Sequence, residues 1–239
     1  MLKLEHVKWK AEDGEEIIKD IDLNIESGKL VVVTGPNGGG KTTLAKLIAG
    51  IEQVTSGKVI LDGKDITNED ITTRAKEGIA YAFQQPVKFK GLTVRDILKL
   101  SAGKDLEEGE ACALLSKVGL CAEEYIDREL NDSLSGGESK RIEIAGVLAR
   151  DAKLLIFDEP EAGIDLWSFS KLVETFEILR KRNKGTLLII SHQERILSIA
   201  DEIIVISGGK VRDMGSREKI LPTLFKEERA NMCPKEKEL

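Results

Sequence analysis

A glycine-rich segment near the N-terminus constrains the fold more than any other feature of this chain. It follows the pattern G-x-x-x-x-G-K-[ST] and comprises Gly35, Pro36, Asn37, Gly38, Gly39, Gly40, Lys41, Thr42 and Thr43. The apolar run Leu30–Thr34 precedes it, and Lys41–Ala49, with a helical pattern, follows. A strand, a glycine-rich turn and a helix in this order predict a phosphate-binding loop, because glycines let backbone amides converge on phosphate oxygens at a helix N-terminus.

Two side chains at the end of this loop suit a nucleotide bound with a divalent cation. Lys41 is expected to reach the β- and γ-phosphates, and the Thr42 hydroxyl is expected to ligate Mg²⁺. An ordinary glycine-rich turn is the alternative. The preceding strand and the following helix favour the phosphate loop.

The order of apolar runs predicts the fold class. Strand-length runs alternate with helical segments, which is typical of an α/β sheet that is largely parallel. Further strands are expected at Lys58–Leu61, Gly78–Phe83, Leu154–Phe157, Thr186–Ser191 and Glu202–Ile206. Together with the phosphate loop, they indicate a P-loop NTPase with a mixed sheet.

Two departures from this alternation define the predicted domains. Leu2–Lys10 and Ile17–Ile25 flank Asp13-Gly14, which predicts an N-terminal antiparallel hairpin. Strand signals disappear between Pro86 and Leu134, where Thr93–Ala102 and Glu107–Val118 have helical spacing. We expect a nucleotide-binding core formed by 1–85 and 134–239 and an inserted helical subdomain at 86–133. A charged C-terminal tail is expected at 216–239, in which 217–229 can form an amphipathic helix.

Polar side chains follow three of the predicted strands. Asp158 and Glu159 suit Mg²⁺ binding and activation of the attacking water, since phosphoryl transfer depends on positioning and charge stabilisation. His192 could hydrogen-bond the γ-phosphate, and Gln84 could contact both Mg²⁺ and water. A solvated acidic pair, a structural histidine and a glutamine in a turn are the alternatives. Carboxyl ends of parallel strands share one edge of a sheet, which favours a common site.

A second glycine-rich helix start lies in Leu134–Glu138. Ser135, Gly136 and Gly137 offer a hydroxyl and bare amides at the beginning of a basic helix. One nucleotide needs one phosphate loop, so this second segment suggests that each chain carries half of two sites.

The bulk properties exclude some partners. The 239 residues carry a net charge of -6, which disfavours duplex DNA and anionic membranes as main partners. No apolar run approaches the ~20 residues that span a bilayer, and the charged N-terminus does not resemble a signal peptide. Three cysteines without metal-site spacing fit a reduced compartment, so a cytoplasmic location is expected.

These motifs, in this order, resemble the nucleotide-binding domain of ABC ATPases over nearly the whole chain. Gly35–Thr43 matches the Walker A loop, Gln84 the Q-loop and Leu134–Glu138 the signature motif. The remaining matches are Leu154–Glu159 to Walker B, Ala162–Asp165 to the D-loop, and His192 to the switch histidine.

The resemblance implies ATP and Mg²⁺ as ligands and two chains packed head to tail in a transient, ATP-dependent homodimer. Ser135 and Gly137 of one chain would then face the γ-phosphate held by Lys41 of the other. It also implies that Glu159 is the catalytic base. Members usually place an aromatic residue for adenine just after the first strand. That position falls near Ala11 or Glu12 here, and the nearby Trp9 either stacks on adenine or packs on the hairpin.

A narrower resemblance is to the SufC family, the ATPases of the Suf iron–sulfur cluster assembly system. Ala82–Val87, Gly163–Asp165 and His192–Leu197 are similar to segments of that family. It implies SufB/SufD-like scaffold subunits as partners. Pro160 and Leu92–Arg95 resemble transporter ATPases instead, which implies a membrane permease as the alternative partner. A DNA-repair ATPase would carry a long coiled coil between Gln84 and Leu134, where only about fifty residues lie.

Overall fold

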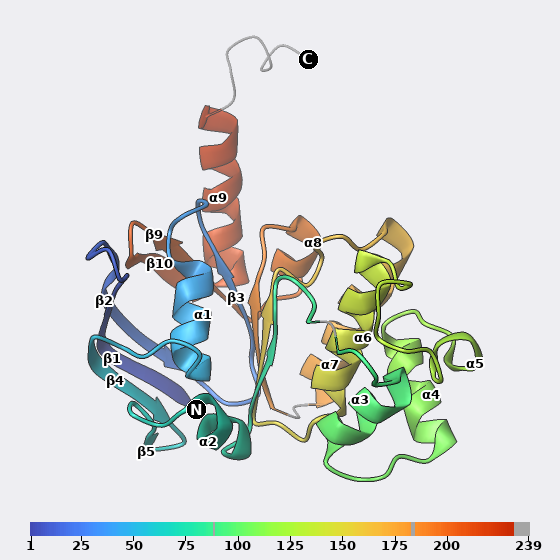
Figure 1. Cartoon of the computed structure of the whole chain (residues 1–239). Coiled ribbons are helices and arrows are strands. Elements are labelled where there is room, and N and C mark those ends of the chain that lie inside the picture. Colours follow the sequence, from blue (N-terminus) through green and yellow to red (C-terminus); the bar gives the residue numbers. More distant parts are fainter. Residues whose placement is uncertain (88, 183–184, 232–239) are drawn as a thin grey trace.

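The ten strands of the described chain form a single mixed sheet that curls at one side (Figure 1). The structure is a computed structural model that describes residues 1–87, 89–182 and 185–231. The strand order is β5-β4-β1-β2-β10-β9-β3-β8-β7-β6. The predicted α/β class and mixed sheet are therefore confirmed.

The central strands run parallel and are buried on both faces. They are β3 (Leu30–Thr34), β6 (Ile79–Ala82), β7 (Leu154–Asp158), β8 (Thr186–Ile190) and β9 (Glu202–Ser207). Pairing of β3 with β8 and β9, and of β7 with β6 and β8, is parallel throughout. Burial on both faces explains why these strands read as continuous apolar runs.

The N-terminal part is antiparallel, as the hairpin pattern predicts. β1 (Leu2–Lys10) pairs with β2 (Glu16–Ile25) and with β4 (Ser56–Leu61), which in turn pairs with β5 (Lys64–Asp65). β10 (Lys210–Ser216) pairs antiparallel with β9 and joins this part to the parallel strands. The sequence did not predict β10, because its charged and small residues do not form the apolar pattern that is typical of a strand.

Alternate residues of β3 separate the two hydrophobic cores. Val31 and Val33 face the core that contains α1 (Lys41–Ala49) and the antiparallel strands. Leu30 and Val32 face the second core, which contains residues of the helical part. This alternation places α1 against one face of β3 and the helical part against the other, and the phosphate loop connects β3 to α1.

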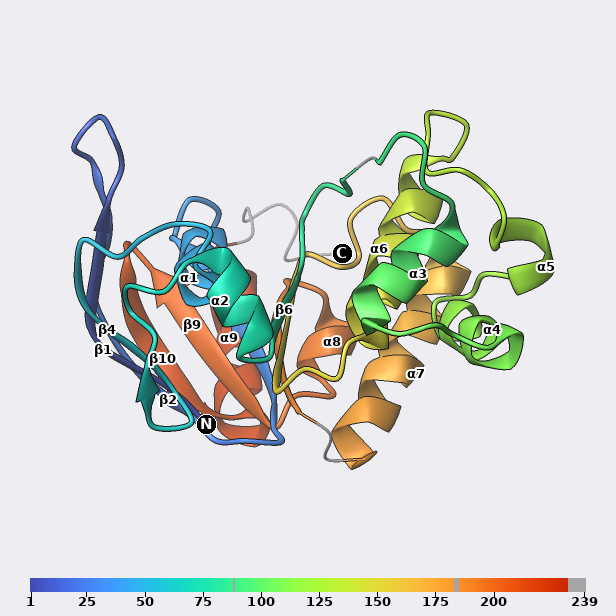
Figure 2. The ribbon, with the colours of Figure 1, turned by 60° about the horizontal axis from the view of Figure 1, so that its bottom comes forward.

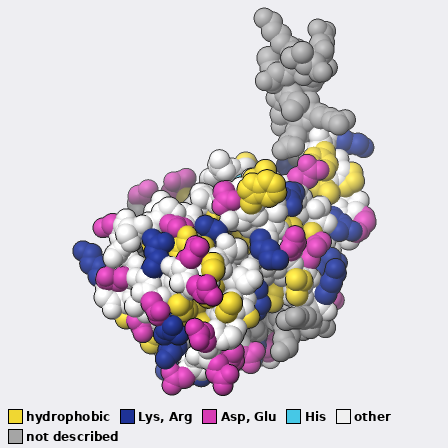
Figure 3. Space-filling view, turned by 90° about the vertical axis from the view of Figure 1, so that its right-hand side faces the viewer, with side chains coloured by type: hydrophobic (Ala, Val, Ile, Leu, Met, Phe, Trp, Pro, Cys, Tyr) yellow, Lys and Arg dark blue, Asp and Glu magenta, His cyan; other side chains and the backbone are white. Residues whose placement is uncertain are grey.

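Six of the described helices lie on the opposite side of the sheet (Figure 2). They are α3 (Val94–Ala102), α4 (Glu108–Lys117), α5 (Ala122–Tyr125), α6 (Gly136–Ala149), α7 (Leu166–Arg182) and α8 (Glu194–Leu197). Among them, α6 contacts β6 and β7, and α3, α4 and α5 lie outside α6. α3 begins at Thr93, whose side chain and that of Asp96 form a reciprocal capping box. Figure 3 views this side and shows Lys and Arg side chains interspersed with Asp and Glu, with hydrophobic patches between them.

Of the remaining helices, α2 (Ile71–Lys76) contacts the edge strand β6, and α9 (Arg217–Asn231) contacts β9 and β10 in the middle of the sheet. Along the chain, α2 precedes β6 and α9 follows β10. Ile220 in the predicted charged tail is only 1% exposed and packs in the second core, so α9 docks on the sheet. Residues 232–239 of that tail, including Cys233, lie outside the described residues. No helix in the described ranges is long and apolar enough to cross a membrane.

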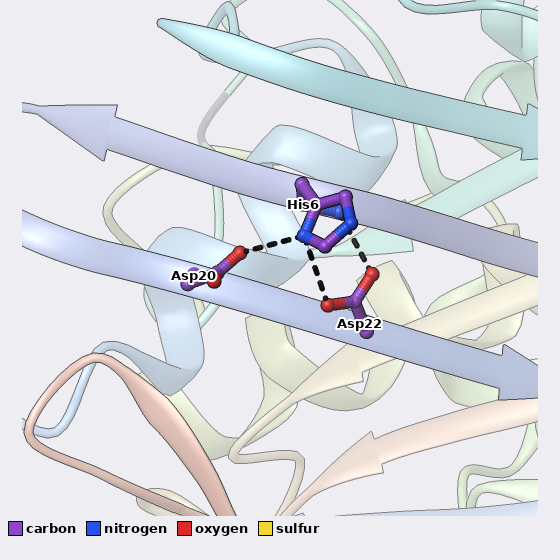
Figure 4. A group of neighbouring side chains, drawn as sticks. All are labelled: His6, Asp20 and Asp22. Atoms are coloured by element: carbon purple, nitrogen blue, oxygen red, sulfur yellow. Dashed lines mark hydrogen bonds and ion pairs between the residues drawn. The ribbon is translucent and has the colours of Figure 1, made fainter.

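His6 lies at an irregularity in β1, where the pairing register with β2 shifts between Leu4 and Val7. Its φ is 48°, and its Nδ1 lies 3.2 Å from Asp20 Oδ1 and 3.3 Å from Asp22 Oδ2 (Figure 4). All three side chains are exposed, so these surface contacts have small energetic weight.

Candidate functional site

The phosphate loop requires glycine at two of its positions. Gly35 has φ 130°, and a Cβ there would lie 2.0 Å from the Ile206 carbonyl oxygen on β9. Gly40 has φ 101°, and a Cβ there would lie 2.7 Å from Ile18 Cδ1. The loop is therefore packed closely against β9 and β2, which fixes the direction in which α1 begins.

Lys41 is the first residue of α1 and is almost completely buried. Its Nζ donates to the carbonyl oxygens of Gly35 at 2.8 Å and Pro36 at 2.9 Å. Burial lowers the pKa of Lys41, and the carboxylates of Glu159 and Asp158 oppose this shift. The ammonium group thus lies over the loop that the sequence predicts to hold phosphates.

An oxygen-rich group joins the phosphate loop to β7. The Thr42 hydroxyl donates to Asp158 Oδ1 at 3.0 Å, and the Tyr81 hydroxyl donates to Asp158 Oδ2 at 2.9 Å. Burial raises the pKa of Asp158, and both hydroxyl bonds act against that rise. Hydroxyl and carboxylate oxygens are the ligands that Mg²⁺ prefers, so these residues fit the expected metal. The sequence predicted Thr42 and Asp158 at this place but not Tyr81.

Glu159 and Gln84 are in direct contact. Gln84 Nε2 donates to Glu159 Oε2 at 2.7 Å, although the two residues follow different strands. Glu159 has φ 45°, in the left-handed region that favours glycine, which is typical of strain kept at functional sites. Its side chain lines a cavity of about 300 Å³ together with Ile17 and the loop residues 37–43. A carboxylate here can reach a water molecule beside a bound phosphate.

His192 lies at the same edge of the sheet, directly after β8 and Ser191. Its Nδ1 lies 3.4 Å from the Thr34 hydroxyl at the end of β3. Burial lowers the pKa of His192, and the positive charge of Lys41 lowers it further. The predicted histidine is therefore close to the phosphate loop, with the neutral ring favoured.

The second glycine-rich segment begins α6 as predicted. Ser135 is the N-cap, and its side chain forms a reciprocal capping box with Glu138. Gly136 and Gly137 form the first turn, where amides have no carbonyl partner within the helix. A Cβ at Gly137 would lie 2.6 Å from the Gly163 carbonyl oxygen, so this turn packs tightly on the segment after Glu159. None of these residues lines the cavity at the phosphate loop of the same chain.

Comparison with known proteins identifies the family. The ABC transporter family matches residues 18–162, which include the phosphate loop, Gln84, the Ser135 segment and Glu159. The chain belongs to the ABC ATPase family. It is accordingly an ATP hydrolase.

Curated relatives of this ABC ATPase span most of its length. It is 37% identical to an uncharacterized ABC transporter ATP-binding protein of Methanocaldococcus jannaschii, covering 87% of this chain and 86% of the relative. It is 32% identical to the lipopolysaccharide export ATP-binding protein LptB of Haemophilus influenzae, covering 89% of each.

Solved structures agree with this fold. A dimeric, post-hydrolysis ATP-binding cassette bound to ADP and phosphate is similar with a TM-score of 0.82 and 25% identity, covering 91% of this chain and 99% of that one. An ATP-binding cassette of an ABC transporter in its ADP conformation has a TM-score of 0.78 and 26% identity, covering 94% of each chain.

Several residues around the site are not predicted by the sequence pattern. Tyr81 and Lys140 both contact Asp158, and the Ser191 hydroxyl donates to Glu161 Oε1 at 2.6 Å. In the sequence, Tyr81 is one aromatic residue in an apolar run, and Lys140 is one basic residue in a basic helix. Trp9 is partly buried against the first core, which agrees with the packing alternative for this residue.

Proposed function

We propose that this ABC ATPase is the separate ATP-binding subunit of a membrane transporter and that it acts in the cytoplasm as an ATP-dependent homodimer. The support comes from relatives that are transporter ATP-binding proteins and from an apolar groove beside Gln84. The relatives have different transported substrates in their names, so the proposal concerns the kind of partner and leaves the cargo open.

The phosphate loop binds the ATP phosphates in this proposal. Backbone amides of the loop residues Gly35, Pro36, Asn37, Gly38, Gly39, Gly40, Lys41, Thr42 and Thr43 surround the phosphate oxygens, and the Lys41 ammonium group neutralises their charge. Thr42, Asp158 and Gln84 would hold Mg²⁺, which neutralises phosphate charge when it is bound. The tight packing of Gly35 on β9 keeps this loop in place for the incoming nucleotide.

Glu159 is the proposed general base. Its carboxylate lines the cavity at the phosphate loop and could accept a proton from the attacking water. Gln84 holds that carboxylate in the present geometry and would orient the water, while His192 would hydrogen-bond the γ-phosphate from the end of β8. These three side chains come from three neighbouring strands, which supports their common role.

A second chain would complete each site. Ser135, Gly136 and Gly137 begin α6 away from the cavity of their own phosphate loop, yet they carry the features of an anion site. Packed head to tail, the first turn of α6 from one chain would approach the γ-phosphate held by Lys41 of the other. The similar dimeric cassette bound to ADP and phosphate supports this arrangement.

The groove beside Gln84 is the proposed contact for a permease. Its volume is about 360 Å³, and its lining is mainly apolar: Tyr81, Phe83, Val87, Phe89, Leu92, Ile97, Leu100, Leu130 and Val147. Val87, Phe89 and Leu100 are exposed at 44%, 43% and 68%. Exposed apolar side chains gathered around a cavity are typical of protein contacts. This groove is the observation that carries the proposal of a docked partner.

Co-purification from native membranes tests the partner. The tagged chain, extracted in mild detergent, is expected to retain an integral membrane protein, and Phe89→Asp is expected to lose it. Ile178→Asp is the matched control, since Ile178 is 47% exposed on α7 and lies outside the groove. Recovery of soluble scaffold subunits without any integral membrane protein would contradict the transporter proposal.

A Suf-type assembly ATPase is the second candidate. Its support is the similarity of Ala82–Val87, Gly163–Asp165 and His192–Leu197 to the SufC family. In that case SufB/SufD-like subunits would occupy the same groove, and ATP hydrolysis would use the same residues. The co-purification experiment separates the two candidates, because the recovered partner is a membrane protein in one and a soluble scaffold in the other.

A further inference from the structure

Lys140 is a buried cation that the hydrolytic mechanism above does not use. Its side chain, on α6, is only 1% exposed. Its Nζ donates to the carbonyl oxygens of Phe83, Gln84 (at 3.2 Å) and Asp158 (at 3.4 Å). An ammonium group has three donors, so these three carbonyls satisfy it without a close carboxylate. Burying a charge is costly, which makes this arrangement demanding to maintain.

Glu143 lies one turn further along α6 and holds the same backbone segment. Its Oε1 accepts a hydrogen bond from the Phe83 amide at 2.8 Å, and its Oε2 lies 4.0 Å from Lys140 Nζ. Side chains of α6 therefore bind both the amide and the carbonyl group of Phe83.

The position of Phe83 explains why side chains are needed there. β6 is the edge strand of the sheet, and its pairing with β7 ends at Ala82 and Phe157. Beyond that pair, the ladder no longer fixes the backbone. Lys140 and Glu143 hold the backbone at Phe83, the first residue past the strand, so side chains of α6 fix the start of the Gln84 segment.

Lys140 also links the two residues that meet at the cavity. It binds the Gln84 carbonyl and the Asp158 carbonyl, and Asp158 directly precedes Glu159. The Gln84 and Glu159 side chains are themselves in contact at 2.7 Å. One buried ammonium group thus holds the backbone on both sides of that contact.

We propose that Lys140, supported by Glu143, is a positioning residue for ATP hydrolysis that sets the place of Gln84 relative to Glu159. The same helix begins at Ser135, so a shift of the first turn of α6 is passed to Gln84 through Lys140. This role concerns the ATPase reaction itself and does not depend on which partner occupies the groove.

A double-mutant cycle on the purified full chain tests the proposal. Lys140→Met removes the ammonium group and leaves an unbranched side chain that is one atom shorter. Gln84→Ala removes the side chain that Lys140 is proposed to place. In the parent chain, Lys140→Met is expected to lower kcat at least about tenfold with less than about threefold change in KM for ATP. In the Gln84→Ala background, the same change is expected to alter kcat by less than about twofold.

Arg74 provides a matched control for the loss of a buried cation. It is 0% exposed, and its guanidinium donates to backbone carbonyls of Leu47, Ile48, Thr67 and Glu69, away from Gln84. Arg74→Met is expected to lower the melting temperature, and its effect on kcat is expected to be the same in both Gln84 backgrounds.

Two results of this cycle would overturn the proposal. An equal loss of kcat from Lys140→Met in both backgrounds, or no loss in either, overturns the proposal. If Lys140→Met does not fold, Lys140→Leu, which also lacks a donor, replaces it in the cycle, and the same results support or overturn the proposal.

Discussion

Gln84 Nε2 donates a hydrogen bond to Glu159 Oε2 at 2.7 Å, which engages the carboxylate that we propose as the general base. The bond joins the segment after β6 to the end of β7, and Glu159 adopts a left-handed backbone conformation there. The attacking water must therefore share this carboxylate with Gln84, so the position of the Gln84 side chain affects how the base meets the water.

Replacement of Glu159 by Gln tests its role as the base. Glu159→Gln keeps the size of the side chain but cannot accept the proton, so kcat is expected to fall about 10²–10⁴-fold. ATP binding is expected to persist, and size-exclusion chromatography with ATP is expected to show a stable dimer. Hydrolysis at the wild-type rate by this variant would show that another group activates the water.

The first turn of α6 offers a matched pair of glycine substitutions. Gly137→Ala would place Cβ 2.6 Å from the Gly163 carbonyl oxygen, whereas a Cβ at Gly136 meets nothing within 4 Å. Overpacking against backbone typically costs about 1–3 kcal/mol. Thermal unfolding is expected to show a lower melting temperature for Gly137→Ala than for Gly136→Ala. Equal melting temperatures for the two variants would contradict this, because they would mean that the backbone at Gly137 and Gly163 moves apart without cost.

Glu143 is expected to make stability depend on pH. Burial raises its pKa from 4.5 to about 7, so between these values the folded state binds more protons than the unfolded state. The free energy of unfolding therefore falls as pH rises through that window. Glu143→Gln removes this carboxyl group, and its Oε1 can still accept from the Phe83 amide.

Urea unfolding at several pH values measures that difference. The stability of Glu143→Gln relative to the wild-type chain is expected to increase from pH 5 to pH 8, because the wild type alone carries the growing cost of a buried charge. A difference that stays constant over this range would contradict the raised pKa of Glu143.

Elements specified by local pattern could be predicted from the sequence. The structure from β3 to α1 depends on residues that are close together in the sequence: the apolar run of β3, the glycines after it and the helical spacing from Lys41. The predicted helix Lys41–Ala49 is the observed α1. The Asp13-Gly14 turn between two apolar runs likewise predicted the β1–β2 hairpin. Asp158, Glu159 and His192 were placed together because parallel strands end at one edge.

Features that depend on distant contacts could not be predicted in this way. Lys140 reads as one charge in a basic helix, and its burial follows from the approach of Phe83 and Asp158, which lie elsewhere in the sequence. Glu143 is hidden for the same reason. The strand β10 could not be predicted because its composition is not typical of a strand. Its pairing with β9, which the sequence pattern does not show, supplies its backbone hydrogen bonds. Burial of polar side chains is a property of the packed molecule.

The shared ATP site is the central claim, and mixing two inactive variants tests it most directly. Lys41→Ala chains lack the phosphate-binding ammonium group, and Ser135→Arg chains block the first turn of α6. Each variant alone has no intact site in a homodimer. A mixed dimer has one intact site, formed by Lys41 of one chain and Ser135 of the other. We predict that ATPase activity is absent from each variant alone and rises to a maximum near equal proportions. No activity at any proportion, with both variants folded and still able to form mixed dimers, would contradict the shared site.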